Sequence, residues 1–271
     1  MSEDFQSDCT ETKTLTPEES RALEYQNSRV VSDHKANLLE IQAKKHWDLF
    51  YKRNETRFFR DRHWTTREFS ELLGDNGPQD EKVLFEIGCG VGNFIYPLLE
   101  ENFNLKVVAC DLSPRAVEFV KSNPSYTPER IKVFPCDITS NEVFDNVQAD
   151  SLDIATLIFV LSAIHPNKFL ACLQNIFKLL KPGGLLLFRD YGLFDMAQLR
   201  FKPGNKISEN FYMRHDGTRT YFFSIDFVKQ LFEEAGYIIH VNSYIHRRTV
   251  NKKDNIDVPR IFIQVKAQKP K

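Results

Sequence analysis

Three glycines alternate with other residues in the segment from Phe85 to Asn93, FEIGCGVGN. Glycines in a turn between a strand and a helix let the backbone bend sharply and approach a ligand closely. Turns that bind a dinucleotide carry their third glycine at the sixth position and place a pyrophosphate on the helix N-terminus. Here Asn93 takes that position, and Glu86 precedes the first glycine. A carboxylate there repels a pyrophosphate and favours a cationic ligand.

Two further carboxylates follow, each at the end of an apolar strand candidate. Asp111 comes about twenty residues after the glycine loop, where a bidentate acceptor can hold the two hydroxyls of a ribose. Asp137 ends the next strand candidate and is placed to accept a hydrogen bond from an adenine amine. Either acid alone could be a loop residue or a helix cap. Together with Glu86, Gly88 and Gly90 they favour a site for S-adenosylmethionine, and a nicotinamide dinucleotide is the alternative.

These residues must be positioned by the elements around them, and strands and helices alternate from Lys82 onward. The strand candidates are mainly apolar: Val83–Ile87, Lys106–Cys110, Ile131–Cys136, Leu152–Phe159 and Leu185–Phe188. The helix candidates between them are Phe94–Glu101, Pro114–Ser122 and Asn167–Leu180. Such alternation is typical of a parallel sheet covered by helices on both faces.

The chain on either side of this core has other patterns. The first fifteen residues are polar and predicted to be disordered. Thr16-Pro17 predicts a helix start, and a helix is expected from Ser32 to Lys52. Later, an Asp-Gly turn between Glu209–Arg214 and Arg219–Phe223 predicts a β-hairpin. A helix Ile225–Ala235 and strands Tyr237–His246 and Arg260–Lys266 are expected to follow. We therefore divide the chain into a tail (1–15), a helical extension (16–79) and an α/β domain (80–271) with an insertion around 191–223.

Composition narrows the class of protein. The 36 Lys and Arg residues nearly balance the 37 Asp and Glu residues, so net charge does not indicate nucleic acid. Basic residues are nevertheless clustered from Lys44 to Arg67 and again near the C-terminus. The five cysteines include no C-x-x-C pair, so we expect no metal site, and a reducing compartment is favoured. No apolar run approaches the length of a membrane span. We expect a cytoplasmic protein, with the nucleus as a second compartment, that does not bind membranes.

The order of these motifs resembles that of class I S-adenosylmethionine-dependent methyltransferases. The resemblance covers about residues 80–268 and includes Leu157–His165 and the segment LKPGG from Leu180 to Gly184. It implies a Rossmann-like α/β fold whose seven-stranded sheet has its last strand antiparallel.

Longer segments resemble the tRNA 3-methylcytidine methyltransferases from about Lys44 onward, and most closely the branch that acts on serine tRNAs together with seryl-tRNA synthetase. They are HWDLFYKRN from His46, FFRDRHW from Phe58, FRDYG from Phe188 and NFYMRHDGTR from Asn210. The resemblance implies methyl transfer from S-adenosylmethionine to N3 of a cytidine in the tRNA anticodon loop. The expected partners are therefore tRNA and seryl-tRNA synthetase, and we expect a monomer when the protein is alone.

The same resemblance implies roles for several side chains. Trp47 and Tyr51, which share a helix face at their i, i+4 spacing, would close over the cofactor. Ile138 would flank the adenine, and Ile158 would line the floor of the pocket. The alternative for the two aromatic rings is packing in the core.

Basic and aromatic residues alternate before the glycine loop, as single-stranded RNA recognition requires. Cations follow phosphates, and aromatic rings stack on unpaired bases. We therefore expect RNA contacts from Arg57, Phe58, Arg60, Arg62 and His63. An Arg60→Ala change should weaken tRNA binding and spare the cofactor. The alternative is a packing subdomain with a charged rim.

The reaction makes few demands on proton transfer, because cytosine N3 carries a free lone pair at neutral pH. Catalysis then depends on positioning that lone pair in line with the methyl carbon and on dipoles suited to the charge that moves from sulfur to the ring. Asp190 is the candidate acceptor for the cytosine amine, with Arg189 and Tyr191 as orienting neighbours. A salt bridge from Asp190 to Arg189 or Arg200 is the alternative.

Three other functions remain open from the sequence. They are a methyltransferase for a protein or small molecule, a dinucleotide oxidoreductase, and a catalytically silent RNA-binding partner of a synthetase. The basic and aromatic segment opposes the first, Glu86 opposes the second, and the complete set of loop and acids opposes the third.

Overall fold

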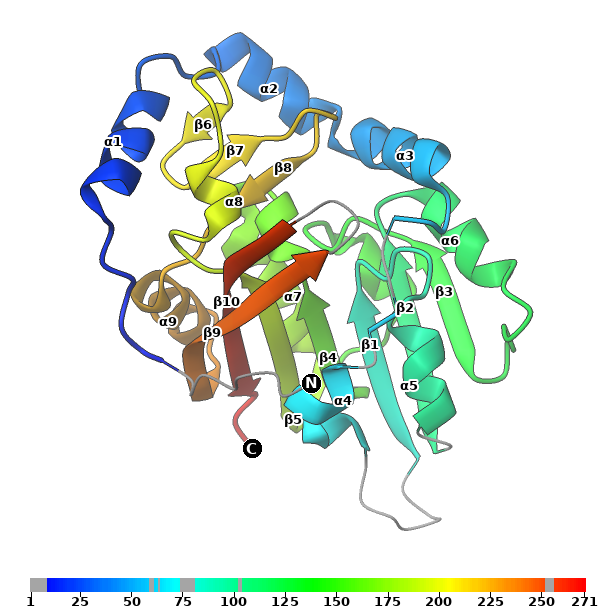
Figure 1. Ribbon diagram of the computed structural model, residues 1–271. Helices are drawn as coiled ribbons and strands as arrows, with labels where there is room; N and C mark the ends of the chain where they lie inside the picture. Colours follow the sequence, from blue (N-terminus) through cyan, green and yellow to red (C-terminus); the bar gives the residue numbers. More distant parts are fainter. Residues whose placement is uncertain (1–8, 59–60, 63, 74–80, 102–103, 252–255) are drawn as a thin grey trace.

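The centre of the protein is a seven-stranded sheet in the order β3-β2-β1-β4-β5-β10-β9. The computed structural model describes residues 9–58, 61–62, 64–73, 81–101, 104–251 and 256–271 (Figure 1). The strands are β1 (Lys82–Ile87), β2 (Leu105–Asp111), β3 (Ile131–Pro135), β4 (Leu152–Ile158), β5 (Leu180–Tyr191), β9 (Ile238–Asn251) and β10 (Ile256–Gln268). Strand β10 alone among them runs antiparallel to its neighbours β5 and β9. The expected class I sheet with an antiparallel last strand is therefore confirmed.

Helices cover both faces of this sheet because its strands are apolar on both sides. One apolar layer contains Phe169, Phe188 and Phe232, and the other contains Leu84, Leu98 and Val117. The covering helices are α5 (Ile95–Glu101), α6 (Pro114–Lys121), α7 (Phe169–Leu179) and α9 (Ile225–Glu234), with short 3₁₀ turns η2 (Asn141–Asp145), η3 (Leu161–Ala163) and η4 (Pro166–Lys168). Within the described residues, no helix combines the length and apolarity that a bilayer crossing requires.

Several elements differ from the sequence expectation; strand β9, for example, continues to Asn251, five residues beyond its expected end at His246. The expected helix from Ser32 to Lys52 is divided into α2 (Asp33–Ile41) and α3 (Ala43–Asn54) by Gln42, whose φ of −96° and ψ of 11° leave the helical region. Strand β5 begins at Leu180, five residues before the predicted start, because Leu180 pairs with Leu152 ahead of a register shift.

The N-terminal segment is more ordered than expected. Thr16 caps α1 (Pro17–Gln26) in a reciprocal pair of hydrogen bonds with Glu19, as predicted for this helix start. Before it, however, the backbone of Cys9 pairs with Tyr244 of β9 through N–O distances of 3.2 and 2.7 Å. An edge strand offers unpaired backbone groups, and here the N-terminal chain uses them. The prediction of a disordered tail through residue 15 is thus wrong from Cys9 onward, and residues 1–8 lie outside the described residues.

The insertion after β5 forms a small sheet under the N-terminal helices (Figure 1). It contains α8 (Met196–Leu199), β6 (Lys206–Ser208), β7 (Phe211–Met213) and β8 (Arg219–Tyr221). The predicted hairpin is confirmed as β7 and β8, and β6 is an additional strand. Gln26 on α1 donates to the Gln198 carbonyl at 2.9 Å, and Glu40 on α2 pairs with Arg219. Helices α1–α3 therefore arch over the end of the sheet toward which β1, β2 and β4 point. The short α4 (Thr65–Glu68) and η1 (Ser70–Leu73) precede β1.

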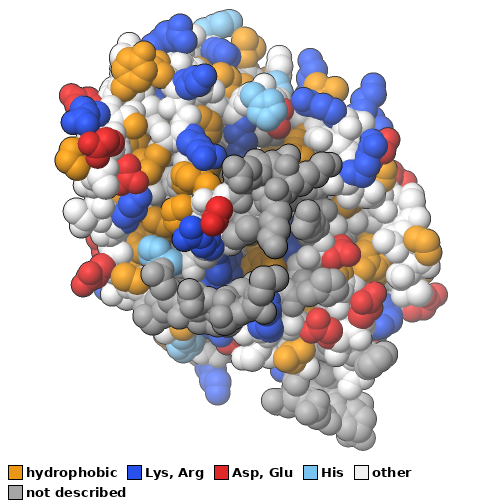
Figure 2. Space-filling view, viewed as in Figure 1, with side chains coloured by type: hydrophobic (Ala, Val, Ile, Leu, Met, Phe, Trp, Pro, Cys, Tyr) orange, Lys and Arg blue, Asp and Glu red, His pale blue; other side chains and the backbone are white. Residues whose placement is uncertain are grey.

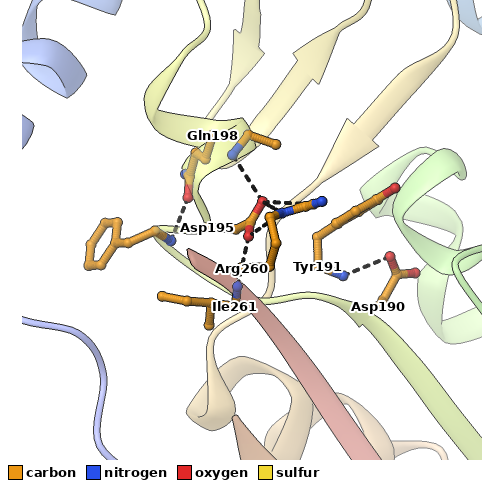
Figure 3. Close-up of polar contacts among 8 residues, drawn as sticks. Asp190, Tyr191, Asp195, Gln198, Arg260 and Ile261 are labelled. Carbon is orange, nitrogen blue, oxygen red and sulfur yellow. Dashed lines mark hydrogen bonds and ion pairs between the residues drawn. The ribbon is translucent and has the colours of Figure 1, made fainter. Parts of the chain in front are cut away.

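Asp195 fastens the insertion to the sheet (Figure 3). Its carboxylate is fully buried and accepts from Arg260 Nε at 2.9 Å, from the Ile261 amide at 2.7 Å and from the Ala197 amide at 2.9 Å. One side chain therefore caps α8 and binds β10.

We expect Asp195→Ala to lower the free energy of unfolding by about 3 kcal/mol, because it leaves a largely buried guanidinium and a buried amide without their acceptor. Chemical denaturation monitored by circular dichroism measures this change. Asp257→Ala is the matched control, since its ion pair with Arg248 is exposed on both sides and its loss should leave stability unchanged. Equal stability of the two variants would contradict this role of Asp195.

Candidate active site

A cavity of about 600 Å³ lies at the carboxyl ends of β1, β2, β4 and β5, beneath α3. Loops that follow parallel strands meet at this edge of an α/β sheet, where such folds bind their ligands. Its walls include all nine residues that were predicted from the sequence to bind the cofactor: Trp47, Tyr51, Glu86, Gly88, Gly90, Asp111, Asp137, Ile138 and Ile158.

Both the backbone conformation and the neighbouring side chains require glycine at two positions of the loop. Gly88 and Gly90 have φ values of +66° and +55°, in the left-handed region that favours glycine. A Cβ on Gly88 would lie 2.4 Å from Val160 Cγ2, and one on Gly90 would lie 3.1 Å from the Tyr51 hydroxyl. The loop is therefore packed directly against the β4 loop and the lid helix α3.

Asp111 holds this loop in place. Its Oδ2 accepts from the Gly90 amide and its Oδ1 from the Ser113 amide, both at 2.9 Å. Burial raises the pKa of Asp111 to about 6, while these two amides oppose the shift. Helix α6 is capped by Ser113, so the carboxylate of Asp111 is not the cap and faces the cavity.

Asp137 and two isoleucines form the wall around the ends of β3 and β4. The Asp137 Oδ1 accepts from the Thr139 amide at 2.9 Å and from its hydroxyl at 2.7 Å, which fixes the turn after β3. Ile138 and Ile158 are almost completely buried and line the cavity. The wall thus combines one oriented carboxylate with apolar surface.

Helix α3 places two aromatic rings over the loop. The ring centroids of Trp47 and Tyr51 are 6.2 Å apart, and both rings line the cavity. Phe50 supports them from within α3, with centroids 5.3 Å from each. Asp48 on the same helix accepts from the Ser113 hydroxyl at 2.8 Å, which ties α3 to α6. The helix is therefore held as a lid over the cavity.

Glu86 lies deepest in the cavity and has an incomplete set of partners. Its side chain is 4% exposed, and its Oε2 has no hydrogen-bond partner among the described residues. Burial raises the pKa of Glu86 to about 8, and Arg62 lessens the shift. A buried carboxylate without a partner is costly, so a cationic ligand group at this position would relieve the cost.

Arg62 was predicted to bind RNA, but the structure places it in the cavity wall. Its amide donates to the Asn93 carbonyl at 2.8 Å, which ties it to the end of the glycine loop. Its guanidinium carbon lies 5.7 Å from the centroid of the Phe159 ring. The side chain is therefore partly buried and lines the cavity.

The three residues predicted to take part in catalysis are consecutive in β5, but their side chains lie in different surroundings. Tyr191 lines the cavity. Asp190 is fully buried, and its carboxylate accepts from the Tyr191 amide at 2.9 Å (Figure 3) and from the Ser162 amide, also at 2.9 Å. Burial raises the pKa of Asp190 to about 6. Neither suggested salt bridge, to Arg189 or to Arg200, occurs between these described residues.

Arg189 is not brought into the cavity. Its guanidinium pairs with Glu68 at 2.5 Å and lies 4.5 Å from the centroid of Trp64. It faces the same side of β5 as Tyr191 but is nearer the middle of the sheet, so α4 covers it. The structure thus brings one of the three residues to the cavity surface.

Two of the residues expected to bind RNA are exposed beside the lid. Arg57 pairs with Glu55 at 2.9 Å on the surface. The Phe58 ring is 56% exposed and packs edge-on against Phe50 with a centroid distance of 4.9 Å. Arg60 and His63 lie outside the described residues.

The residues on the open side of the cavity were not predicted from the sequence. Glu40, His165, Lys168, Arg214 and Arg219 all line it. Glu40 bridges Lys168 at 2.5 Å and Arg219, so it joins α2 to η4 and to the insertion. The guanidinium carbon of Arg214 lies 5.4 Å from the centroid of Tyr191. Arg214 and Arg219 belong to a segment that was singled out for its resemblance, and their side chains were left without a role.

Helices α2 and α3 also carry exposed cations. Figure 2 shows Lys and Arg side chains along the upper rim of the molecule, where α2 and α3 lie in Figure 1. Those on these helices with exposed side chains are Lys35, Lys44, Lys45, Lys52 and Arg53.

Comparison with known proteins agrees with this geometry. Residues 51–240 match the family model described as a methyltransferase domain. The chain is 56% identical over 259 residues to the tRNA N(3)-cytidine methyltransferase METTL6 of Homo sapiens, covering 95% of this chain and 91% of that protein. It is 42% identical to the tRNA N(3)-methylcytidine methyltransferase Mettl2 of Drosophila melanogaster, covering 85% and 73%.

The chain belongs to the tRNA N(3)-cytidine methyltransferase family.

Solved structures support the fold of this family member. An S-adenosylmethionine-dependent methyltransferase from Anabaena variabilis superposes with a TM-score of 0.60 at 13% identity, covering 83% of this chain and 94% of that one. A Burkholderia thailandensis N1-methyltransferase solved with S-adenosylhomocysteine superposes with a TM-score of 0.51 at 16% identity, covering 96% and 93%.

As a tRNA N(3)-cytidine methyltransferase family member, the protein uses S-adenosylmethionine as its cofactor, and the cavity fits that molecule. The unpartnered Glu86 Oε2 suits a cationic group, and the left-handed turn at Gly88 and Gly90 forms part of the cavity wall without side chains. The carboxylates of Asp111 and Asp137 line the same cavity as hydrogen-bond acceptors.

The raised pKa of Glu86 predicts that cofactor binding releases a proton. With a pKa of about 8, Glu86 is mostly protonated at pH 7, whereas a bound ammonium requires the carboxylate. Affinity for S-adenosylhomocysteine should therefore rise from pH 6 toward pH 8, with close to one proton released at pH 7. Calorimetry in buffers of different ionisation enthalpy measures that proton. Glu86→Gln should abolish the release, and release that persisted in this variant would contradict the assignment.

Proposed function

We propose that this protein methylates N3 of a cytidine in the anticodon loop of serine tRNAs, with S-adenosylmethionine as the methyl donor. The observation that carries the proposal is the cavity, which has a cofactor end closed by α3 and an opposite side lined by cations and Tyr191. The 56% identity to a tRNA N(3)-cytidine methyltransferase supports the reaction. A Saccharomyces cerevisiae relative named for cytosine 32 of threonine tRNA, 40% identical over 81% of this chain and 36% of that protein, supports the position.

The cofactor supplies a methyl group on a sulfonium, and the protein has to hold and enclose it. Asp111 would accept from the ribose hydroxyls and Asp137 from the adenine amine. Trp47 and Tyr51 would exclude water from above, since their rings already cover the glycine loop. Glu86 would compensate positive charge on the cofactor.

The acceptor base requires positioning and no general base, because cytosine N3 is unprotonated at neutral pH. A base that leaves its loop stack can enter the open side of the cavity and stack on Tyr191. Arg214 contacts the Tyr191 ring, and Asp190 fixes the Tyr191 and Ser162 amides. We therefore propose that Asp190 is a positioning residue and that Tyr191 touches the base. Arg189 supports β5 through Glu68.

The RNA outside the cavity is expected to follow the exposed side of α2 and α3 with its phosphates. We propose Arg57 and Phe58 as contacts in this path. Arg60 and His63 remain sequence predictions for the same role, whereas Arg62 belongs to the cavity.

Phe58→Ala should weaken tRNA binding about 10-fold, because stacking of a base on an aromatic ring contributes about 1–3 kcal/mol. Binding of S-adenosylhomocysteine should be unchanged, since the Phe58 ring is outside the cavity. Fluorescence anisotropy with labelled tRNA and calorimetry with the cofactor measure the two affinities. Ile238→Ala, which removes an exposed apolar side chain on β9, is the control. Unchanged tRNA binding in Phe58→Ala would remove Phe58 from the proposed path.

Mass spectrometry of nucleosides tests the reaction itself. Purified protein, S-adenosylmethionine and bulk tRNA should yield 3-methylcytidine, and the yield should be concentrated in serine tRNAs isolated by hybridisation. Methylation of protein extract with no product in tRNA would overturn the proposal in favour of another acceptor.

We further propose that seryl-tRNA synthetase acts as a partner, and that the protein is a monomer when alone and works in the cytoplasm and nucleus. The support for the partner is the sequence resemblance to the serine branch. Adding the synthetase to the same reaction should raise the yield of 3-methylcytidine in serine tRNAs. No change in rate and no co-elution in gel filtration would contradict the partnership while leaving the reaction intact.

A further inference from the structure

Arg62 brings a guanidinium to the closed side of the cavity, next to Glu86. Its backbone is fixed on both sides: its amide donates to the Asn93 carbonyl at 2.8 Å, and its carbonyl accepts from the Thr65 hydroxyl at 2.8 Å. Its side chain lines the same cavity as Glu86 and influences the ionisation of that carboxyl. The two groups, which are opposite in charge once Glu86 is ionised, therefore face one space from different segments of the chain.

Glu86 and Arg62 both have hydrogen-bonding capacity that the described residues do not use. The Glu86 Oε2 has no hydrogen-bond partner among the described residues. Within the same residues, the Arg62 side chain makes one hydrogen bond, from Nη1 to the Ile158 carbonyl at 3.4 Å. A guanidinium has five N–H donors in a planar fork, so most of its capacity is available to a ligand. The Phe159 ring, 5.7 Å from the guanidinium carbon, supports the group from one side.

We propose that Arg62 binds the α-carboxylate of S-adenosylmethionine, while Glu86 binds the α-ammonium of the same molecule. The amino-acid end of the cofactor carries both charges on one carbon, and the cavity offers the complementary pair. The fork geometry of arginine matches a carboxylate. This inference rests on the cofactor and not on the identity of the RNA.

An RNA ligand explains the position of Arg62 less well. Phosphates of a folded tRNA remain at the protein surface, whereas the Arg62 side chain is partly buried and lines the same cavity as the buried Glu86. The cofactor carboxylate would lie within the cavity and does not have that conflict.

Calorimetry with two cofactors tests the assignment without measuring activity. Decarboxylated S-adenosylmethionine keeps the ammonium, sulfonium and adenosine and lacks only the carboxylate. The wild-type protein should bind S-adenosylmethionine at least about 10-fold more tightly than the decarboxylated compound, as a charge-assisted pair implies. Arg62→Gln should weaken the binding of S-adenosylmethionine by about 10- to 100-fold and leave the affinity for the decarboxylated compound unchanged. Arg62→Lys should restore part of the preference.

The control is Arg67→Gln, which makes the same chemical change at an exposed site on α4. It should leave both affinities unaltered. Retained binding of the decarboxylated compound shows that the Arg62→Gln site is folded. If Arg62→Gln kept the preference for S-adenosylmethionine, the inference would be overturned. If the variant also bound tRNA more weakly, Arg62 would be assigned to RNA binding. Either result would leave the proposed methylation of tRNA standing, because cofactor binding and product formation are measured separately.

Discussion

Asp111→Ala is expected to abolish detectable binding of S-adenosylmethionine while the protein remains folded. The carboxylate has two functions at once. It holds the Gly90 and Ser113 amides, and its remaining lone pairs face the cavity, where the ribose hydroxyls would donate. A hydrogen bond to a charged group contributes about 1.5–3 kcal/mol. Loss of the ribose contacts together with a displaced glycine loop should therefore weaken affinity by about 1000-fold or more.

The measurement is calorimetry with S-adenosylhomocysteine, with circular dichroism to verify folding. Asp111→Asn keeps one oxygen acceptor and should have intermediate affinity. Asp145→Ala, an exposed acid on η2, is the matched control and should bind normally. Normal affinity in Asp111→Ala would mean that another residue holds the ribose, and it would also contradict the division of the cavity.

Gly88→Ala should produce the second large loss, and a companion change should relieve part of it. The new Cβ would lie 2.4 Å from Val160 Cγ2, closer than two carbons can approach, at a φ of +66°. Either the β4 loop or the glycine loop must move, and both line the cavity. Overpacking of this kind costs about 1–3 kcal/mol, so we expect lower stability and an affinity for the cofactor reduced by about 100-fold.

The double variant Gly88→Ala with Val160→Ala separates the two causes. It removes the contact and keeps the left-handed backbone, which costs a residue with a Cβ about 1–2 kcal/mol. Gly183→Ala has a comparable φ of +82° and meets only the Lys271 side chain, at 3.6 Å, so it should lose stability without losing affinity. Absence of rescue in the double variant would show that backbone strain and not the contact with Val160 is responsible.

The central sheet and the cofactor site could be predicted from sequence because their determinants are local. An apolar run defines each strand, and Glu86, Asp111 and Asp137 stand at or near strand ends, which a parallel sheet brings to one edge. No contact between distant segments has to be known for this inference. The glycine loop is equally local, since its φ values are set by residue type.

Other residues could not be placed in this way, because their positions depend on contacts between distant segments. Arg62 resembles its basic neighbours in sequence, and only the pairing of its amide with Asn93 turns it into the cavity. Asp190 and Tyr191 are adjacent, yet β5 directs them to opposite faces. The ion pair with Glu68, which lies on a different element, holds the Arg189 side chain away from the cavity. The cations of the open side come from the insertion, whose docking under α2 depends on Glu40.

The lid helix α3 also has a kinetic meaning. Trp47 and Tyr51 cover the glycine loop from the same helix that leads directly into Phe58, where RNA is expected to dock. A tRNA lying along this segment would hold the helix down and block the path by which the cofactor enters. Substrates should then add in a compulsory order, with S-adenosylmethionine first, and S-adenosylhomocysteine should leave only after the methylated tRNA has departed.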